Sequence, residues 1–354
     1  MLSSNRLTEL LKIKHPIIQG PFGGNLSTIE LVAAVSNSGG LGSYGAHILS
    51  PVEIKKLIGD IRSATQNPFA INLWVSNFDE GHDQISEEEF ESYLEPFKPF
   101  YDELHLDYPS YPERYYEDFE TQVEALIEAA PAVFSFVFGV PDTAILKDCK
   151  KNNILTLGAA TTVDEAVALS DAGVDIILAT GFEAGGHRVA FQKPAEKSLI
   201  GTLALVPQVV DAVPQPVVAA GGIADARGIK AALTLGAEAA QLGTAFLACT
   251  ESGTNDFHRK SLFGNKAENT VLSRSFTGRL ARFIPNKFIS ECETSSELPL
   301  PFPIQSFFAS PLKLAAARKS IEKFSSHYAG QGTGLLKHRS AFDLMDQLIT
   351  DLSN

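Results

Sequence analysis

Eight short apolar segments recur along the first 250 residues and alternate with segments whose apolar residues have helical spacing. Strands that alternate with helices are typical of parallel βα units. Eight strands, rather than five or six, favour closure into a barrel over an open doubly wound sheet. The sequence therefore predicts an α/β fold, a TIM (β/α)8 barrel, with strands at 16–20, 41–45, 69–75, 133–139, 154–160, 176–179, 216–222 and 238–246. Helices are expected at 7–12, 29–36, 51–61, 113–129, 141–150, 162–171, 199–213 and 225–235.

Two segments do not follow this alternation. Residues 76–112, after the third strand, are acidic and aromatic, and their prolines are expected to interrupt any long helix. They are interpreted either as an insertion over the barrel mouth or as a surface insertion. Residues 251–354 form a loop-rich stretch with helices expected at 311–324 and 341–352. We expect residues 1–250 to form the barrel, and 251–354 to form a mainly helical C-terminal subdomain that packs on it and narrows the site.

Composition limits the partners and the compartment. The net charge of −13 argues against nucleic acid as a partner, because phosphate binding needs clustered Lys and Arg. The longest apolar stretch, residues 129–140, is too short to cross a membrane, and the N-terminus lacks the apolar core of a signal peptide. Cys149, Cys249 and Cys292 have neither disulfide-framework nor zinc-ligand spacing. A metal-free protein in the cytoplasm is expected.

Polar and glycine residues follow five of the expected strands. In a closed barrel the loops after the strands share one rim, where active sites are built. The loop after the sixth strand, 181–188, combines glycines with His187 and Arg188. His187 alone could be a loop histidine bonded to a carbonyl, but five such loops on one rim favour a site. The other four contribute Gln19 with Pro21, Phe22, Gly23 and Gly24; Asn72; Gly221 and Gly222; and Gln241, Leu242, Gly243 and Thr244.

The loops after the seventh and eighth strands have the composition of a phosphate cradle. Gly221 and Gly222 lead into a helix that Asp225 can cap, and Gly243 and Thr244 follow the eighth strand. Barrels commonly hold a phosphate between these two loops with backbone N–H groups and a helix dipole. A tight turn without a ligand is the alternative. No Walker A or GxGxxG fingerprint occurs, which disfavours a Rossmann NAD site.

Four ordered motifs, QGPFGGNLS, GFEAGGHR, PVVAAGGIADARG and LGAEAAQLGTAF, resemble the nitronate monooxygenase family, formerly called 2-nitropropane dioxygenases. YAGQG near the C-terminus is also similar to that family. The resemblance implies FMN, with its phosphate between the glycine loops. It places Asn72, Thr180, Gly185 and Gly186 at the flavin, and Gln19, Pro21, Phe22 and Gly23 along the isoalloxazine. Thr180 stands where some members have glutamine.

The resemblance also implies oxidation of alkyl nitronates, such as propionate 3-nitronate, by O₂ to a carbonyl compound and nitrite, through a flavin semiquinone. His187 would hold the nitro oxygens or remove the α-proton of a nitroalkane. Arg188 would raise the local positive potential or, as we favour, pair structurally with a carboxylate. The alternatives are an NAD(P)H-dependent flavin reductase of the enoyl-ACP reductase or quinone reductase type, and a non-catalytic binding barrel. We also expect a role in detoxification and a possible homodimer.

Overall fold

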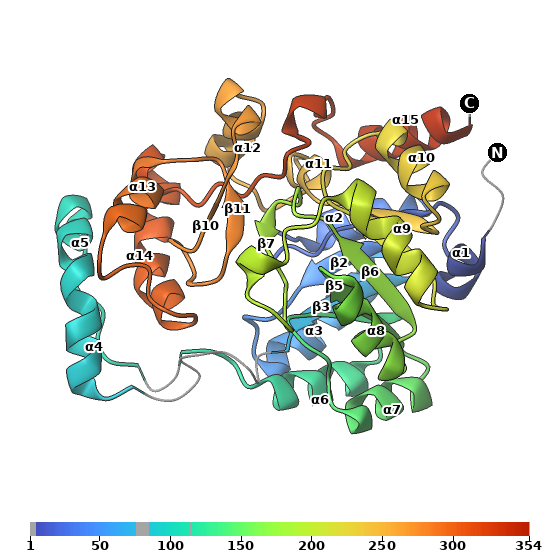
Figure 1. Cartoon of the computed structure of the whole chain (residues 1–354), viewed down its shortest axis with the longest axis horizontal. Helices are drawn as coiled ribbons and strands as arrows, with labels where there is room; N and C mark the ends of the chain where they lie inside the picture. Colours follow the sequence, from blue (N-terminus) through green and yellow to red (C-terminus); the bar gives the residue numbers. More distant parts are fainter. Residues whose placement is uncertain (1–4, 76–84, 113–114, 354) are drawn as a thin grey trace.

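The computed structural model describes residues 5–75, 85–112 and 115–353. Eight parallel strands form one sheet in the order β1-β9-β8-β6-β5-β4-β3-β2. A parallel bridge between Ile18 and Leu41 joins β1 to the start of β2, so the sheet closes on itself as a TIM barrel (Figure 1). The barrel strands are β1 (Ile17–Gln19), β2 (Gly42–Gly45), β3 (Phe69–Trp74), β4 (Val133–Val137), β5 (Leu155–Ala160), β6 (Ile176–Thr180), β8 (Val217–Ala220) and β9 (Ala239–Leu242).

Capping side chains set where the barrel helices begin. Thr28, Ser50, Thr162 and Asp225 each accept a hydrogen bond from a first-turn N–H, which satisfies a backbone donor that the helix itself leaves unpaired. The barrel helices are α1 (Arg6–Leu11), α2 (Ile29–Asn37), α3 (Pro51–Ala64), α6 (Phe119–Ala129), α7 (Thr143–Lys151), α8 (Val163–Asp171), α9 (Thr202–Ala212), α10 (Ala226–Thr234) and α15 (Ala341–Ser353). Apolar faces of these helices pack on the sheet in three buried clusters, the largest of which involves α3 and α6–α9.

Several expected boundaries were wrong. The eighth barrel strand, expected at 238–246, ends at Leu242, and Thr244–Leu247 form the short helix α11. The helix expected at 113–129 begins only at Phe119, after the N-cap Asp118. The helix expected at 311–324 is α14 (Ile304–Lys319), which contains Pro311 in its interior. Local sequence misplaced these limits because tertiary packing overrides the propensity of single prolines and β-branched residues.

A second, three-stranded sheet lies outside the barrel, in the order β10-β11-β7. It joins β7 (Gly186–His187), in the loop after β6, to β11 (Ala281–Phe283) and β10 (Val271–Ser273) of the C-terminal segment. Figure 1 shows this sheet between the barrel and the C-terminal helices. The remaining C-terminal elements are α12 (Asp256–Leu262), α13 (Lys287–Thr294), η3 (Asn265–Glu268), η4 (Glu322–Phe324) and η5 (Thr333–Leu335), while η2 (Ala195–Lys197) lies between β7 and α9.

Residues 87–104 of the insertion are helical, but no helix there is longer than eight residues, as expected from its prolines. This stretch comprises α4 (Glu87–Leu94), η1 (Glu95–Phe97) and α5 (Lys98–Leu104). Pro96 and Pro99 occupy first-turn positions of η1 and α5, where no helical N–H is needed. These helices pack with α13 and α14 in an aromatic cluster. The Tyr101 hydroxyl donates to the Phe308 carbonyl over 2.8 Å. No helix within the described residues is long and apolar enough to cross a membrane.

Candidate active site

His187 is held by backbone pairing as well as by its side chain. On β7 it lies opposite Ala281 of β11, and the neighbouring Arg188 N–H donates to the Leu280 carbonyl over 2.7 Å. Its Nε2 lies 3.0 Å from the Thr277 hydroxyl. That hydroxyl also lies 3.2 Å from the Arg279 carbonyl, to which it donates. The arrangement that satisfies all three groups has His187 donating from Nε2, which leaves Nδ1 as the unprotonated nitrogen.

Aromatic side chains surround the His187 imidazole. Trp74, at the end of β3, meets it edge-on with 4.9 Å between ring centroids. Phe138, which follows β4, lies 6.2 Å away, and Tyr328 of the C-terminal segment lies 5.9 Å away. The barrel and the C-terminal segment therefore both contribute to the surroundings of this histidine.

Two cations act on the same imidazole. The Arg279 guanidinium stacks over Phe138 at 3.5 Å and Phe302 at 4.2 Å, and it lies 5.0 Å from the Trp74 ring. Burial, Arg279, His47 and Lys313 together hold the pKa of His187 well below its ordinary value. Burial also lowers the pKa of the Lys313 ammonium to about 8. At neutral pH the histidine is therefore neutral in a positively charged environment, which suits an anionic ligand.

The glycine loops after β6, β8 and β9 meet the C-terminal segment. Gly221 and Gly222 have φ angles of 112° and 69°, which favour glycine. The Gly330 N–H donates to the Thr244 hydroxyl over 2.9 Å. A methyl group at Gly332 would come within 2.7 Å of the Gly222 carbonyl oxygen. Residues 329–332, the AGQG of the YAGQG motif, therefore pack on both loops of the expected phosphate cradle.

Of the helices that follow β8 and β9, only the second begins without a side-chain cap. Asp225 accepts hydrogen bonds from the N–H groups of Arg227 and Gly228, so the first turn of α10 is already capped. The short helix α11 begins directly after Gly243 without a capping side chain. Backbone donors suited to a phosphate are thus concentrated at Gly243 and Thr244.

The three expected amide side chains differ in their surroundings. Gln19 is fully buried, and its amide accepts from the Ser43 N–H over 2.8 Å and donates to the Gly20 carbonyl. Asn72 donates to the Ser135 hydroxyl over 3.0 Å. Gln241 is partly exposed at the end of β9, beside Gly20 of the first loop. Gln19 therefore joins β1 to β2, whereas the Gln241 amide is accessible at the rim.

The remaining expected positions lie on the same rim. Pro21 and Phe22 form the turn after β1, where the Phe22 N–H donates to Ser27, and the Phe22 ring approaches the space next to Gly243. Thr180 and Leu242 are buried at the ends of β6 and β9. Other members of the set are glycines: Gly23 contacts His47, Gly185 packs on Gly330, and Gly186 has a φ of 80° with open space on its side-chain face.

Arg188 has structural contacts, and among the described residues its hydrogen bonds go to backbone carbonyls rather than to carboxylates. It is buried, and its guanidinium donates to the carbonyl groups of Thr161, Thr180 and Ser198. These hydrogen bonds connect the loop after β6 to the ends of β5 and β6. The expected carboxylate pair is not among these hydrogen bonds, although Glu165 and Glu183 raise the pKa of the guanidinium against the effect of burial.

Comparisons with known proteins agree with this geometry. The family model described as nitronate monooxygenase matches residues 4–351. The chain belongs to the nitronate monooxygenase family. It is 38% identical to a probable nitronate monooxygenase of Staphylococcus aureus strain MRSA252, over 100% of this chain and 98% of that protein.

Two solved structures are also similar. The nitroalkane oxidase of Streptomyces ansochromogenes superposes with a TM-score of 0.86 at 34% identity, over 98% of this chain and 97% of that chain. FabK of Thermotoga maritima superposes with a TM-score of 0.76 at 27% identity, over 99% and 96%. The likeness extends over the whole chain in both cases, so it includes the C-terminal segment that holds His187.

In this member of the nitronate monooxygenase family, sequence reasoning missed four side chains around His187: His47, Trp74, Arg279 and Lys313. Trp74 ends an expected strand and could have been noticed as a tryptophan at the rim. Arg279 stands in the segment FTGRLARF, whose basic residues gave no indication of the strand that it precedes. His47 and Lys313 carried no motif signal.

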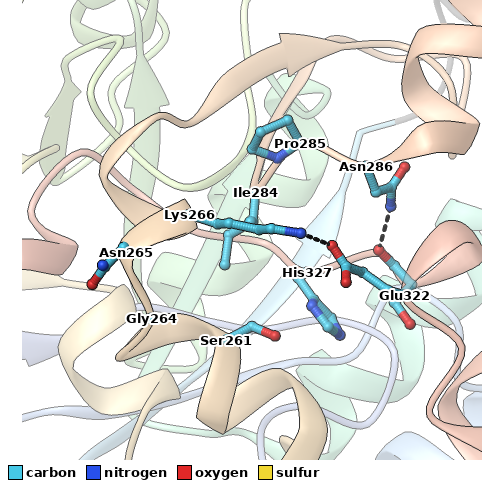
Figure 2. Close-up of a pocket in the computed structure, with 10 residues that line it drawn as sticks. Ser261, Gly264, Asn265, Lys266, Ile284, Pro285, Asn286, Glu322 and His327 are labelled. Carbon is cyan, nitrogen blue, oxygen red and sulfur yellow. Dashed lines mark hydrogen bonds and ion pairs between the residues drawn. The ribbon is translucent and has the colours of Figure 1, made fainter.

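A separate cavity of about 310 Å³ lies among residues 261–327 of the C-terminal segment and contains none of the expected site residues. Figure 2 shows Lys266 reaching across it to Glu322, while Asn286 donates to the Ser325 carbonyl over 2.8 Å. His327, on its wall, stacks on His258 with 4.6 Å between centroids. The polar groups around this cavity largely satisfy one another.

Proposed function

We propose that the protein oxidises alkyl nitronates with O₂ to a carbonyl compound and nitrite, using FMN. The observation that carries this proposal is the position of His187, beside Trp74 and under the influence of two cations, on the rim that also carries the glycine loops. A nitronate is a small anion, and a positively charged environment favours its binding. The family and the similar nitroalkane oxidase support the same chemistry.

The residues present fit a phosphorylated flavin. The uncapped start of α11 at Gly243 and Thr244, facing Gly221 and Gly222, would hold the phosphate through backbone N–H groups. Amides of Asn72 and Gln241 and the turn at Pro21 and Phe22 would contact the ring system, while Gln19 supports that turn from behind. Thr180, Gly185, Gly186 and Leu242 would line the same site. The flavin supplies the electron chemistry when bound.

The chain's own residues orient the substrate and move protons. Arg279 and Lys313 would attract the anion to the rim, and Trp74, Phe138 and Tyr328 would exclude water from one side of it. With a neutral nitroalkane, the unprotonated Nδ1 of His187 would take the α-proton, while Nε2 stays bonded to Thr277. With a preformed nitronate this proton transfer is unnecessary.

The test is a steady-state assay of nitrite release and O₂ consumption with propionate 3-nitronate, ethyl nitronate and nitroethane, alongside NADH oxidation. Nitronate-dependent nitrite release without NADH consumption supports the proposal. Rapid NADH oxidation without nitrite would instead support the flavin reductase considered from the sequence. We place the enzyme in the cytoplasm, which is consistent with three buried, unpaired cysteines, Cys149, Cys249 and Cys292.

A further inference from the structure

We propose that His47 is a second substrate-binding histidine, which donates a hydrogen bond from Nε2 to an oxygen of the nitro or nitronate group. The inference rests on the proposed function and deepens it, because it divides the work between two imidazoles. His187 would accept a proton, and His47 would hold the oxygen on which negative charge resides.

The position of His47 places it beside the candidate catalytic group. It follows β2, and the adjacent Ala46 N–H donates to the Asn72 carbonyl over 2.9 Å. Its ring stacks on Trp74 with 3.7 Å between centroids and an interplanar angle of 2°. The same indole meets His187 edge-on at 4.9 Å. One tryptophan therefore positions both imidazoles.

The surroundings of His47 determine which nitrogen carries its proton. Nδ1 is fully buried and has no hydrogen-bond partner, although the residue as a whole is partly exposed. A buried N–H without an acceptor is rarer than a buried acceptor without a donor. Burial, Arg279 and Lys313 lower the pKa of His47 to about 3, so the imidazole is neutral at pH 7. The favoured form is a neutral imidazole whose proton is on Nε2.

A nitro compound can use two neutral histidines, one that accepts its α-proton and one that donates a hydrogen bond to its oxygen. The bond to Thr277 leaves His187 with an acceptor nitrogen, so it cannot also donate to a nitronate oxygen from that nitrogen. His47 supplies the missing donor. Hydrogen bonds to a charged oxygen are about twice as strong as neutral ones, so this contact contributes directly to affinity.

Gly23 explains how the chain accommodates this histidine. A methyl group at Gly23 would lie 2.3 Å from His47 Cε1, closer than real side chains approach. Only glycine in the turn after β1 therefore allows the ring its place on Trp74. Gly23 was expected along the isoalloxazine, and here its neighbour is the imidazole that we assign to the substrate.

Three substitutions of His47 distinguish a hydrogen bond to the substrate from a role in packing against Trp74. His47→Phe keeps a ring on Trp74 without a donor, His47→Gln places an amide N–H near Nε2, and His47→Asn places it nearer Nδ1. We expect His47→Phe to raise KM for ethyl nitronate roughly 10-fold or more, the scale expected for losing a bond to a charged group. The Ki for nitrite, added as the proposed product, should rise to a similar extent. His47→Gln should recover most of the loss.

The exposed His105 provides a matched control, since His105→Asn should leave KM and Ki unchanged. The flavin absorbance of each variant checks that it has folded. Wild-type KM and Ki in His47→Phe would overturn the proposal. If His47→Phe does not retain flavin, the Gln and Asn variants decide. Equal KM and Ki values for His47→Gln and His47→Asn would overturn the proposal, whereas higher KM and Ki values for His47→Asn would support it. Absence of nitronate oxidation by the wild type would instead reject the proposed function.

Discussion

At the scale of single residues, the surroundings of His187 come from side chains that are distant from it in the chain. A histidine in a glycine loop after an apolar strand is a local pattern, and the pattern was sufficient to single it out. Its partners Thr277, Arg279 and Lys313 lie 90 or more residues away in the chain. Thr277 and Arg279 precede β11, which pairs with β7, and Lys313 comes from α14. Local sequence patterns extend over a few residues, so they cannot predict contacts between residues that are 90 or more positions apart.

Substituting His187 separates its two possible roles. We expect His187→Ala to retain FMN, because the flavin contacts are assigned to the barrel loops. With neutral nitroethane, turnover should fall roughly 10²–10⁴-fold, the usual cost of losing a general base. With preformed ethyl nitronate the loss should be much smaller. Equal losses with both substrates in a nitrite-release assay would contradict the assignment of Nδ1 as the proton acceptor.

At the scale of elements, the barrel was predictable and the second sheet was not. The eight barrel strands are apolar runs separated by helices, so their order and number followed from the sequence. The strand β7 has two residues, and no hydrophobic alternation can be detected over two positions. Similarly, the eighth barrel strand was expected to continue through Phe246, whereas β9 ends at Leu242 and a turn at Gly243 starts α11.

The contact between the C-terminal segment and the rim can be tested with two glycines. Gly332→Ala would drive a methyl group against the Gly222 carbonyl at 2.7 Å, whereas a methyl group at Gly334 would meet nothing within 4 Å. We expect Gly332→Ala to lower the FMN content of the purified protein and its Tm, and Gly334→Ala to match the wild type. Equal flavin-to-protein absorbance ratios in the two variants would show that the segment does not support the cradle.

At the scale of the whole molecule, two buried clusters join segments that are distant in the chain. The aromatic cluster unites the insertion with α13 and α14, and we propose that these parts form one C-terminal unit, with the barrel as the other. Composition alone indicated a large apolar core but not this association. Its aromatic residues come from two segments separated by most of the barrel.

The stability of the molecule should depend on pH through its buried histidines. His258 and His327 are 4% and 6% exposed, and burial lowers their pKa values to about 4 and about 3. Because the unfolded chain takes up these protons below about pH 6.5 and the folded chain does not, the free energy of unfolding should fall as pH decreases from about 6.5 to 5. The limiting slope is about 1.4 kcal/mol per pH unit for each histidine.

Urea denaturation at several pH values measures this dependence. His327→Phe keeps a ring against His258 but removes one titrating group, so its unfolding free energy should fall less steeply over the same interval. A variant with the same slope as the wild type would show that His327 does not titrate as the structure implies.

The central claim is that the rim around His187 binds a flavin and presents a nitronate to it. Its most direct test is the visible spectrum of the purified protein, mixed under anaerobic conditions first with propionate 3-nitronate and separately with NADH. We predict a yellow protein whose flavin absorbance changes with the nitronate and stays unchanged with NADH. A colourless protein, or a flavin that responds to NADH and not to the nitronate, would contradict the account.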